Sequence, residues 1–356
     1  FDLSERFNIP VVLRLVTRLA HSRAVVEVGP ARAENPMSKV PDPSSWILLP
    51  SIARRQWHQL LGQQKDMVEY AEQCRHNPLT LNNDWRGLGV ITTGIARNYY
   101  MEAAEDMGEA PSHLHIGAYP MPVDKIRKLF DHVERVLVLE EGFPFVERAL
   151  RGILPIEKDI LGKMNGRVPL EGELNPDIAR VALGLEIPEG VSLSNVSLPN
   201  RPPQLCKGCP HGDAYGAIKE ALSEYEQTMV TSDIGCYTLG ALPPYSAIES
   251  CVCMGASVGM AKGAAEAGFH PVVAVIGDST FLHSGVTPLM DAATADTNMT
   301  LVILDNEIVA MTGLQPTVLP SSRLETLIPG VGVNPEHFHV LDAHPKRIKE
   351  NTDILK

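Results

Sequence analysis

The sequence of 356 residues contains no apolar run long enough to span a membrane, so we expect no membrane partner. It has no excess of positive charge either, since the formal net charge is −12, and this argues against nucleic acid as a partner. Internal repeats and low-complexity tracts are also missing. With 44% hydrophobic residues, the chain can bury a sizeable core, and its length allows about two or three domains.

The N-terminus has no initiator methionine, and it lacks the basic segment and apolar stretch of a signal peptide. We therefore expect a cytoplasmic protein with reduced thiols. A strand pattern begins almost at once, over 8–15, and a helical pattern is still running close to Lys356. Both patterns predict that this sequence starts and stops inside domains, so that it is truncated at both ends.

Apolar strand patterns alternate with helical patterns along most of the chain. Strands are predicted at 88–94, 113–117, 135–141, 228–233, 271–277 and 299–305. Helices are predicted at 95–107, 123–133, 145–154, 212–225, 255–268 and 286–295. A proline-rich stretch at 187–204 with little periodicity is typical of a linker. The alternation predicts an α/β fold with consecutive doubly wound parallel sheets.

Two oxygen-bearing side chains follow neighbouring apolar strands of the predicted second sheet. Asp278 comes directly after the run 272–276 and Gly277, and Asn306 comes just after the run 301–304. A helix between them makes the crossover, so both side chains reach the carboxyl edge of one parallel sheet, where such sheets bind ligands. A carboxylate and an amide oxygen are ligands that Mg²⁺ accepts beside a diphosphate.

This arrangement resembles the thiamine diphosphate signature, in which Gly-Asp-Gly is followed by a helix, a second strand and an Asn. Here Ser279 stands in place of the second glycine. A Gly-Asp pair alone is a weak signal, because an Asp at a strand end also serves as a turn residue or a helix cap. The complete pattern over both strands favours a metal–diphosphate site at Asp278 and Asn306.

Five of the six cysteines fall between Cys206 and Cys253, which predicts metal or redox chemistry rather than a disulfide framework. Cys206 and Cys209 form a Cys-x-x-Cys turn before a helix, and Cys236 follows the next strand. Three thiols from one α/β unit suit an iron–sulfur centre. Two alternatives stay open: a dithiol redox pair, or a zinc site whose fourth ligand is His211, Cys251 or Cys253.

Longer strings resemble the alpha subunit of indolepyruvate ferredoxin oxidoreductase, in the family of thiamine diphosphate-dependent 2-oxoacid:ferredoxin oxidoreductases. The resemblance covers nearly the whole chain, and its motifs are specific in combination. They are NIPVVLR at 8–14, AHSR at 20–23, LCKGCPH at 205–211, SDIGCYTLG at 232–240, CMGAS at 253–257, GDSTFLHSG at 277–285 and LDNEIVAMTG at 304–313.

The resemblance implies a set of site residues. Mg²⁺ would be bound by Asp278, Asn306 and the backbone carbonyl of Ile308. Thiamine diphosphate would be lined by Met254, Gly255, Gly277, Ser279, Thr280 and Thr312. A [4Fe–4S] cluster would be bound by Cys206, Cys209 and Cys236. His283 is the catalytic candidate, facing the substrate carboxylate or moving a proton, with a purely structural histidine as the alternative.

The implied reaction is the oxidative decarboxylation of an aryl 2-oxoacid such as indolepyruvate to an acyl-CoA, with electrons passed through iron–sulfur clusters to ferredoxin. Coenzyme A, ferredoxin and a smaller beta subunit are the implied partners, in a hetero-oligomer. Two other functions are weighed against it. A non-redox 2-oxoacid decarboxylase would need no cysteine cluster, and an inactive fragment would keep only cofactor binding.

The resemblance also implies an order of domains. Residues 1–78 would end a pyrimidine-binding domain, 79–190 form a transketolase C-terminal-like α/β domain, 191–204 a linker and 205–356 the diphosphate-binding domain. The family's glutamate that activates the aminopyrimidine would precede residue 1, and the fourth cluster cysteine would follow Lys356. The chain is therefore expected to hold the diphosphate half of the site.

Overall fold

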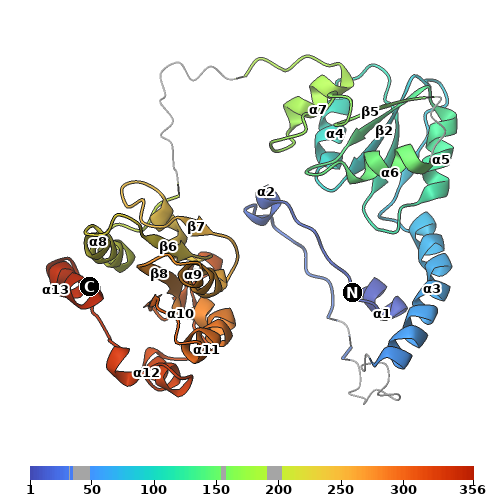
Figure 1. Ribbon diagram of the computed structural model, residues 1–356. Coiled ribbons are helices and arrows are strands. Elements are labelled where there is room, and N and C mark those ends of the chain that lie inside the picture. The colour runs from blue at the N-terminus through green and yellow to red at the C-terminus, as the bar shows by residue number, and fades with distance from the viewer. Residues whose placement is uncertain (32, 35–48, 154–157, 191–202) are drawn as a thin grey trace. The chain divides into compact units, whose positions relative to one another are not determined.

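The computed structural model describes residues 1–31, 33–34, 49–153, 158–190 and 203–356, and it divides the chain into two compact units, Phe1–Ser192 and Leu193–Lys356 (Figure 1). Each unit is a layered α/β fold built around its own mainly parallel sheet, which confirms the predicted fold class. Residues 191–202 of the predicted linker lie outside the described residues. Within the described ranges, no helix is both long and apolar enough to cross a membrane.

The sheet of the first unit has the strand order β1-β3-β2-β4-β5, in which β1 pairs antiparallel and the others pair parallel. The apolar runs predict its three central strands, whereas edge strands of two or three residues carry no detectable pattern. The strands are β1 Leu79–Thr80, β2 Leu88–Thr93, β3 Ser112–Ile116, β4 Arg135–Leu139 and β5 Asp159–Leu161.

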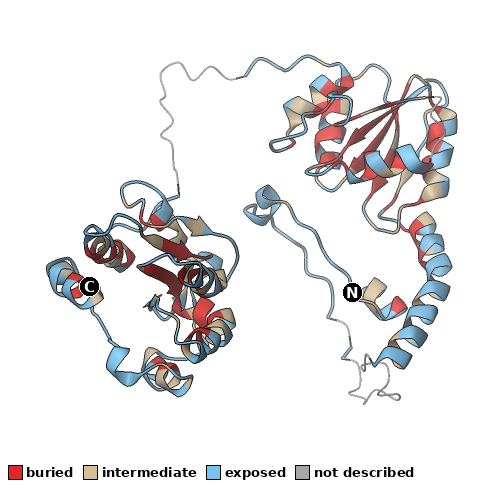
Figure 2. Cartoon of the chain, viewed as in Figure 1, coloured by how far each residue is buried: buried red, intermediate tan, exposed pale blue. Residues whose placement is uncertain are grey.

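Helices cover both faces of this sheet and bury its apolar side chains (Figure 2). Helices α4 (Ala96–Ala104) and α7 (Pro176–Leu183) pack on one face, and α5 (Val123–His132) and α6 (Phe145–Ile153) pack on the other. Tyr100 of α4 lies against one side of the sheet and is 3% exposed. Three further helices precede this core: α1 Asp2–Phe7, α2 Thr17–Ala20 and α3 Pro50–Gln73.

The strand predicted over 8–15 is wrong, because these residues run as irregular chain between α1 and α2. Their apolar side chains lie in solvent, with Val12 88% and Leu13 83% exposed. A strand needs a neighbour to satisfy its backbone hydrogen bonds, and no described strand pairs with this segment. The apolar alternation is present, but the described residues offer it no sheet.

The second unit is built on a four-stranded sheet with the order β7-β6-β8-β9, in which all pairs are parallel. Strand β8 is buried along its whole length, as its unbroken apolar run predicts. A separate antiparallel pair, β10 with β11, follows the last strand. The bounds are β6 Met229–Ser232, β7 Ser250–Cys251, β8 Val272–Gly277, β9 Thr300–Leu304, β10 Ile308–Val309 and β11 Gln315–Pro316.

Helices again cover both faces of the second sheet. Helix α8 (Pro210–Leu222) packs on one face through Tyr215, which is fully buried, and α13 (Ile348–Leu355) packs against α8. The other face is covered by α9 (Ala256–Glu266), α11 (Val286–Thr294) and α12 (Ser321–Gly330). Between β8 and α11 the chain forms the short helix α10, Asp278–Thr280, and a π-helical turn, Phe281–Gly285.

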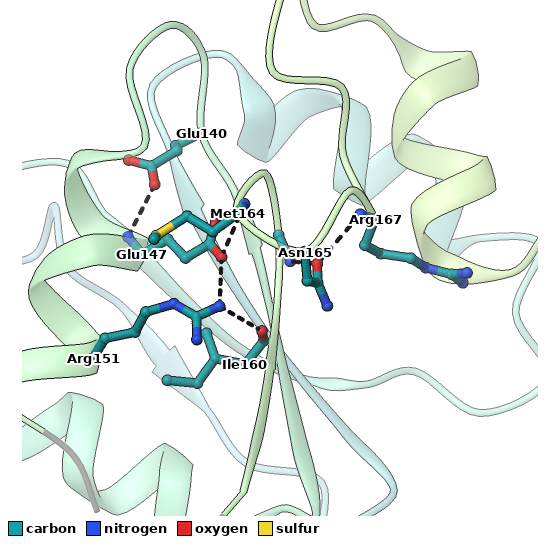
Figure 3. A network of polar contacts seen from close by, with 8 residues as sticks. Glu140, Glu147, Arg151, Ile160, Met164, Asn165 and Arg167 are labelled. Atoms are coloured by element: carbon teal, nitrogen blue, oxygen red, sulfur yellow. Dashed lines mark hydrogen bonds and ion pairs between the residues drawn. The ribbon is translucent and has the colours of Figure 1, made fainter. Parts of the chain in front are cut away.

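A buried carboxylate network closes the carboxyl edge of the first sheet (Figure 3). Glu140, 3% exposed, follows β4 and accepts the backbone N–H groups of Val146 and Glu147 at 2.9 and 3.0 Å. Glu147 in turn accepts the Met164 N–H at 3.0 Å and the Arg151 guanidinium at 3.1 Å. Both carboxylates have donors, and no buried side-chain polar atom of this unit's described part lacks a partner. The network is therefore structural.

Two histidines in the first sheet share one hydroxyl group. The Thr92 hydroxyl lies 2.9 Å from His113 Nε2 and 2.9 Å from His115 Nδ1. The His113 ring also packs on Tyr100, with ring centroids 4.3 Å apart. Burial, followed by the charges of His115 and Arg97, lowers the pKa of His113 to about 3. The folded chain therefore holds this imidazole neutral.

We expect this neutral imidazole to make the first unit sensitive to acid. In the unfolded chain His113 binds a proton as the pH falls below 6.5, whereas in the folded chain it binds one only near pH 3. Between pH 6.5 and pH 5 the free energy of unfolding should thus fall by about 2 kcal/mol more in the wild type than in His113→Gln.

All three tryptophans, Trp46, Trp57 and Trp85, precede residue 192, so denaturation followed by tryptophan fluorescence reports this unit. His58→Gln, at an exposed position, should match the wild type; equal pH slopes in all three proteins would refute the expectation.

Candidate functional site

Four strand ends of the second unit meet at the carboxyl edge of its sheet, because all four strands are parallel. Asp233 follows β6, the segment 252–255 follows β7, Asp278 follows β8, and the segment 305–308 follows β9. The predicted cofactor residues Met254, Gly255, Gly277–Thr280 and Asn306 therefore lie on neighbouring loops of one sheet edge. Thr312 lies farther along the last loop, in a 3-10 turn.

Asp278 is the most buried of the predicted metal ligands, with 4% of its surface exposed. One carboxylate oxygen, Oδ1, accepts the Ser279 N–H at 2.6 Å, and the other, Oδ2, is buried with no hydrogen-bond partner among the described residues. In β8 and β9, Gly277 pairs with Leu304, so Asp305 stands next to Asp278. Burial is the largest cause that raises the pKa of the Asp278 carboxyl, and the neighbouring Asp305 side chain raises it further, first as a hydrogen-bond partner of the protonated form and then through its charge.

The environment of Asp278 fits a divalent cation. A buried carboxylate oxygen without a donor is costly in a folded protein, and a second carboxylate beside it adds repulsion. A hard cation such as Mg²⁺ would satisfy the free oxygen and offset both effects. The same loop set holds another unpartnered buried atom, the Ser279 hydroxyl.

Asp233 is a central residue of this edge that the sequence reasoning did not single out. It is fully buried, and its Oδ2 accepts the Gly255 N–H at 3.1 Å, the Ser257 N–H at 3.2 Å and the Ser257 hydroxyl at 2.6 Å. Its Oδ1 accepts the Tyr237 hydroxyl. Asp233 thus caps the start of α9 and fixes the loop after β7 against the loop after β6. The sequence feature that could have identified Asp233 is its position directly after a strand, which it shares with Asp278.

Tyr237 connects the turn that bears Cys236 with the end of strand β8. Its ring lies against Gly277, where an added Cβ would come within 2.6 Å of the ring. The backbone carbonyl of Ile234 accepts the Thr280 hydroxyl at 3.1 Å, which joins the same two loops a second time. Gly277 is therefore needed for the close approach of Tyr237, whereas its φ of −81° is a value that any residue adopts.

The segments that carry Gly255 and His283 meet through Ser284, although they are far apart in the sequence. Gly255 has a φ of +82°, and a Cβ there would collide with the Ser284 side chain. The Ser284 hydroxyl donates to the Met254 carbonyl at 3.1 Å and lies 3.0 Å from His283 Nδ1. When the hydroxyl gives its one proton to the Met254 carbonyl, His283 donates through Nδ1–H, and this bond does not use Nε2 of the exposed ring.

Asn306 and Ile308 belong to an exposed loop that turns sharply after β9. The Asn306 side-chain oxygen accepts the Ile308 N–H at 3.2 Å, and Ile308 pairs with Pro316 across the β10–β11 hairpin. Glu307, between them, has a left-handed φ of 56°. Its carboxylate accepts both the N–H and the hydroxyl of Ser321, and these bonds lower its pKa. Thr312 is bonded to Gln315 at 2.7 Å and holds the end of the hairpin loop.

The three predicted cluster cysteines lie on two loops of this unit. Cys209 caps the start of α8, Cys206 precedes it in an exposed turn, and Cys236 begins a 3-10 turn after β6. Burial, followed by the charges of Cys206 and Cys209, raises the pKa of the Cys236 thiol. Among the described residues, however, no group of three or more His, Cys, Asp or Glu side chains has a metal-binding arrangement. The thiols have suitable chemistry for a cluster without being gathered around one point.

The fold and the strand-end carboxylates have their counterpart in a known class of proteins. Residues 233–335 match the family described as thiamine pyrophosphate enzyme, C-terminal TPP binding domain. This match begins at Asp233 and includes Asp278, Asn306 and His283. The second unit therefore carries a thiamine pyrophosphate-binding domain.

The whole chain is also similar to curated relatives. It is 35% identical to indolepyruvate oxidoreductase subunit IorA of Methanothermobacter thermautotrophicus and 33% identical to that of Archaeoglobus fulgidus, in both cases over 100% of this chain and 60% of the relative. The IorA of Thermococcus kodakarensis is 34% identical over 89% of this chain and 54% of its own length. The chain spans about 60% of the length of the first of these relatives.

Solved structures show only weak likeness. A 2-oxoglutarate:ferredoxin oxidoreductase from Magnetococcus marinus, with 2-oxoglutarate, coenzyme A and succinyl-CoA bound, is 19% identical with a TM-score of 0.34, over 44% of this chain and 61% of that one. Benzoylformate decarboxylase from Polynucleobacter necessarius is 13% identical with a TM-score of 0.30, over 82% and 62%. These TM-scores are too low to support an argument.

We expect Asp233→Asn to destabilise the second unit by about 3 kcal/mol. The four donors around Asp233 bond to two carboxylate oxygens, whereas an asparagine side chain has only one oxygen that can accept. The second unit contains no tryptophan, so its unfolding should appear in calorimetry as a transition that tryptophan fluorescence does not follow. Asp353→Asn, at an exposed position of the same unit, should leave that transition in place. Equal transition temperatures for the two variants would show that Asp233 does not hold this edge together.

Proposed function

We propose that this chain supplies the diphosphate-binding half of the active site in a thiamine diphosphate-dependent 2-oxoacid:ferredoxin oxidoreductase that acts on an aryl 2-oxoacid such as indolepyruvate. The observation that carries the proposal is the buried, unpartnered Oδ2 of Asp278 beside Asp305, within the segment that matches the thiamine pyrophosphate-binding family. The relation to IorA along the whole chain supports the substrate class.

The proposed metal ligands are Asp278, Asn306 and the backbone carbonyl of Ile308, which would hold Mg²⁺ against the diphosphate. The proposed cofactor-lining residues are Met254, Gly255, Gly277, Ser279, Thr280 and Thr312. Thiamine diphosphate, when bound, supplies the carbanion chemistry that allows a 2-oxoacid to lose carbon dioxide. This chain's own contribution is to neutralise the diphosphate and to fix its position at the sheet edge.

His283 is the proposed catalytic residue. Its Nδ1 lies 3.0 Å from the Ser284 hydroxyl, which is itself bonded to the Met254 carbonyl, so the ring is oriented by the predicted cofactor loop. Its exposed Nε2 would accept a proton or, after protonation, pair with the substrate carboxylate. This orientation supports a catalytic role over a purely structural one.

Cys206, Cys209 and Cys236 are proposed to bind a [4Fe–4S] cluster that takes electrons from the decarboxylated substrate. The placement of the three cysteines on two loops of one unit supports this, since Cys206 and Cys209 precede α8 and Cys236 follows β6. Met311 also acts on the Cys236 thiol through its backbone, and Met311 neighbours Thr312 of the proposed cofactor lining.

The domain assignment and the partners belong to the same proposal. We assign 205–356 to the diphosphate-binding domain, 79–190 to a transketolase C-terminal-like domain, and 1–78 to the end of a pyrimidine-binding domain. The match over 233–335 supports the first assignment. A smaller beta subunit, coenzyme A and ferredoxin would complete a cytoplasmic enzyme.

The cofactor site can be tested by calorimetric titration of the 356-residue chain with thiamine diphosphate in the presence of Mg²⁺. Asp278→Asn should weaken binding by at least about 100-fold, or about 2.7 kcal/mol, because it removes the charged metal ligand. Without ligand, the same variant should be as stable as the wild type or about 1 kcal/mol more stable, because it removes the repulsion with Asp305. Asp353→Asn should bind like the wild type. Unchanged binding by Asp278→Asn would contradict the metal assignment.

The redox assignment can be tested on the complete complex, purified without oxygen. We expect iron, acid-labile sulfide and a broad visible absorption band, and dye reduction that depends on coenzyme A. Turnover with indolepyruvate or phenylpyruvate should exceed turnover with pyruvate. Cys236→Ser should lower the iron content while thiamine diphosphate binding persists. Decarboxylation by an iron-free complex would contradict the redox function and leave the cofactor site standing.

A further inference from the structure

We propose that Glu307 is a positioning residue that holds the metal-binding loop by tying it to the first turn of α12. The inference rests on the proposed function, since Glu307 stands between Asn306 and Ile308, the two proposed Mg²⁺ ligands of this loop. Glu307 does not bind the metal in this proposal. It determines where its two neighbours can place their oxygens.

The side chain of Glu307 is bonded at a distance in the sequence. Its Oε1 accepts the Ser321 N–H at 3.1 Å and the Ser321 hydroxyl at 2.8 Å. Ser321 is the first residue of α12, where backbone N–H groups have no partner within the helix. A carboxylate is favoured at this positive end of the helix. These bonds therefore give the first residue of α12 a hydrogen-bond acceptor and also anchor the loop to the helix.

The backbone of Glu307 is held as well. Its N–H donates to Asp305 Oδ1 at 3.2 Å, and its carbonyl accepts the Thr317 N–H at 3.0 Å. Its φ of 56° is a left-handed conformation that is unfavourable for a non-glycine residue. Three anchoring bonds from 317 to 321 offset this cost.

The anchor leads back to the core that carries Asp278. Leu324 and Ile328 of α12 are buried in the same apolar cluster as Ile276 of β8 and Phe281 after it. Asn306 and Ile308, by contrast, are exposed and have no such packing of their own. Glu307 therefore links the loop after β9, through α12, to the apolar core that carries Asp278. This link would keep Asn306 and Ile308 in a constant position relative to Asp278.

The test measures the Mg²⁺ concentration that half-saturates thiamine diphosphate binding to the 356-residue chain. Glu307→Ala should raise this concentration by about tenfold, the scale typical of residues that support metal ligands. Glu307→Gln keeps the accepting oxygen and should stay within about threefold of the wild type. Glu325→Ala, an exposed site on the same helix, should not change it. Hydrogen exchange of the Ser321 amide in the ligand-free chain should be fast in Glu307→Ala and slow in Glu307→Gln.

Each result has one reading. Wild-type and Glu307→Ala chains that bind Mg²⁺ and cofactor equally overturn the role of Glu307 and leave the proposed function standing. A wild-type chain that binds no thiamine diphosphate overturns the proposed function and the positioning role with it. Equal exchange of the Ser321 amide in all variants also overturns the inference, because the anchor would then not exist in solution. If Glu307→Ala does not fold, its calorimetric unfolding transition will be lost. In that case Glu307→Gln is compared with Glu307→Asp, whose shorter side chain moves the carboxylate away from Ser321. Equal Mg²⁺ and cofactor binding by these two variants overturns the inference.

Discussion

The carboxyl edge of the second sheet depends on the parallel pairing of β8 with β9, in which Gly277 lies opposite Leu304. That register brings Asp278 and Asp305 side by side, and burial leaves one oxygen of Asp278 without a donor. Two neighbouring carboxylates with an unsatisfied acceptor form an unfavourable arrangement unless a cation joins them. The second unit carries this local cost within an otherwise well-packed core, as binding sites commonly do.

A comparison of the two units strengthens this view. Both place acidic residues at the carboxyl edge of a parallel sheet, yet Glu140 of the first unit receives two backbone N–H groups from the start of α6. Its neighbour Glu147 is equally well supplied. Strand-end carboxylates are therefore not sites by position alone. The difference is whether the fold provides donors, and at Asp278 the described residues leave Oδ2 without one.

The second sheet shows the same contrast within a single edge. Asp233 and Asp278 follow adjacent strands, but Asp233 accepts four hydrogen bonds and is a structural centre. By fixing Tyr237 and the start of α9, it holds the loops on which the proposed cofactor residues and Cys236 lie. Glu307 does comparable work on the far side of Asp278, through Ser321. In the candidate site, Asp278, whose Oδ2 has no donor among the described residues, thus lies between Asp233 and Glu307, whose carboxylates accept hydrogen bonds.

The sequence by itself determined the α/β class, the central strands and the positions of Asp278 and Asn306 at strand ends, because apolar runs and strand-end positions are local patterns. It misjudged 8–15, since an apolar alternation makes a strand only where a partner strand exists. Tertiary structure alone decided which acids are satisfied, which loops meet and that His283 stands beside Met254. Hydrogen bonds such as Asp233 to Ser257 and Glu307 to Ser321 join residues far apart in the chain, and no local pattern encodes them.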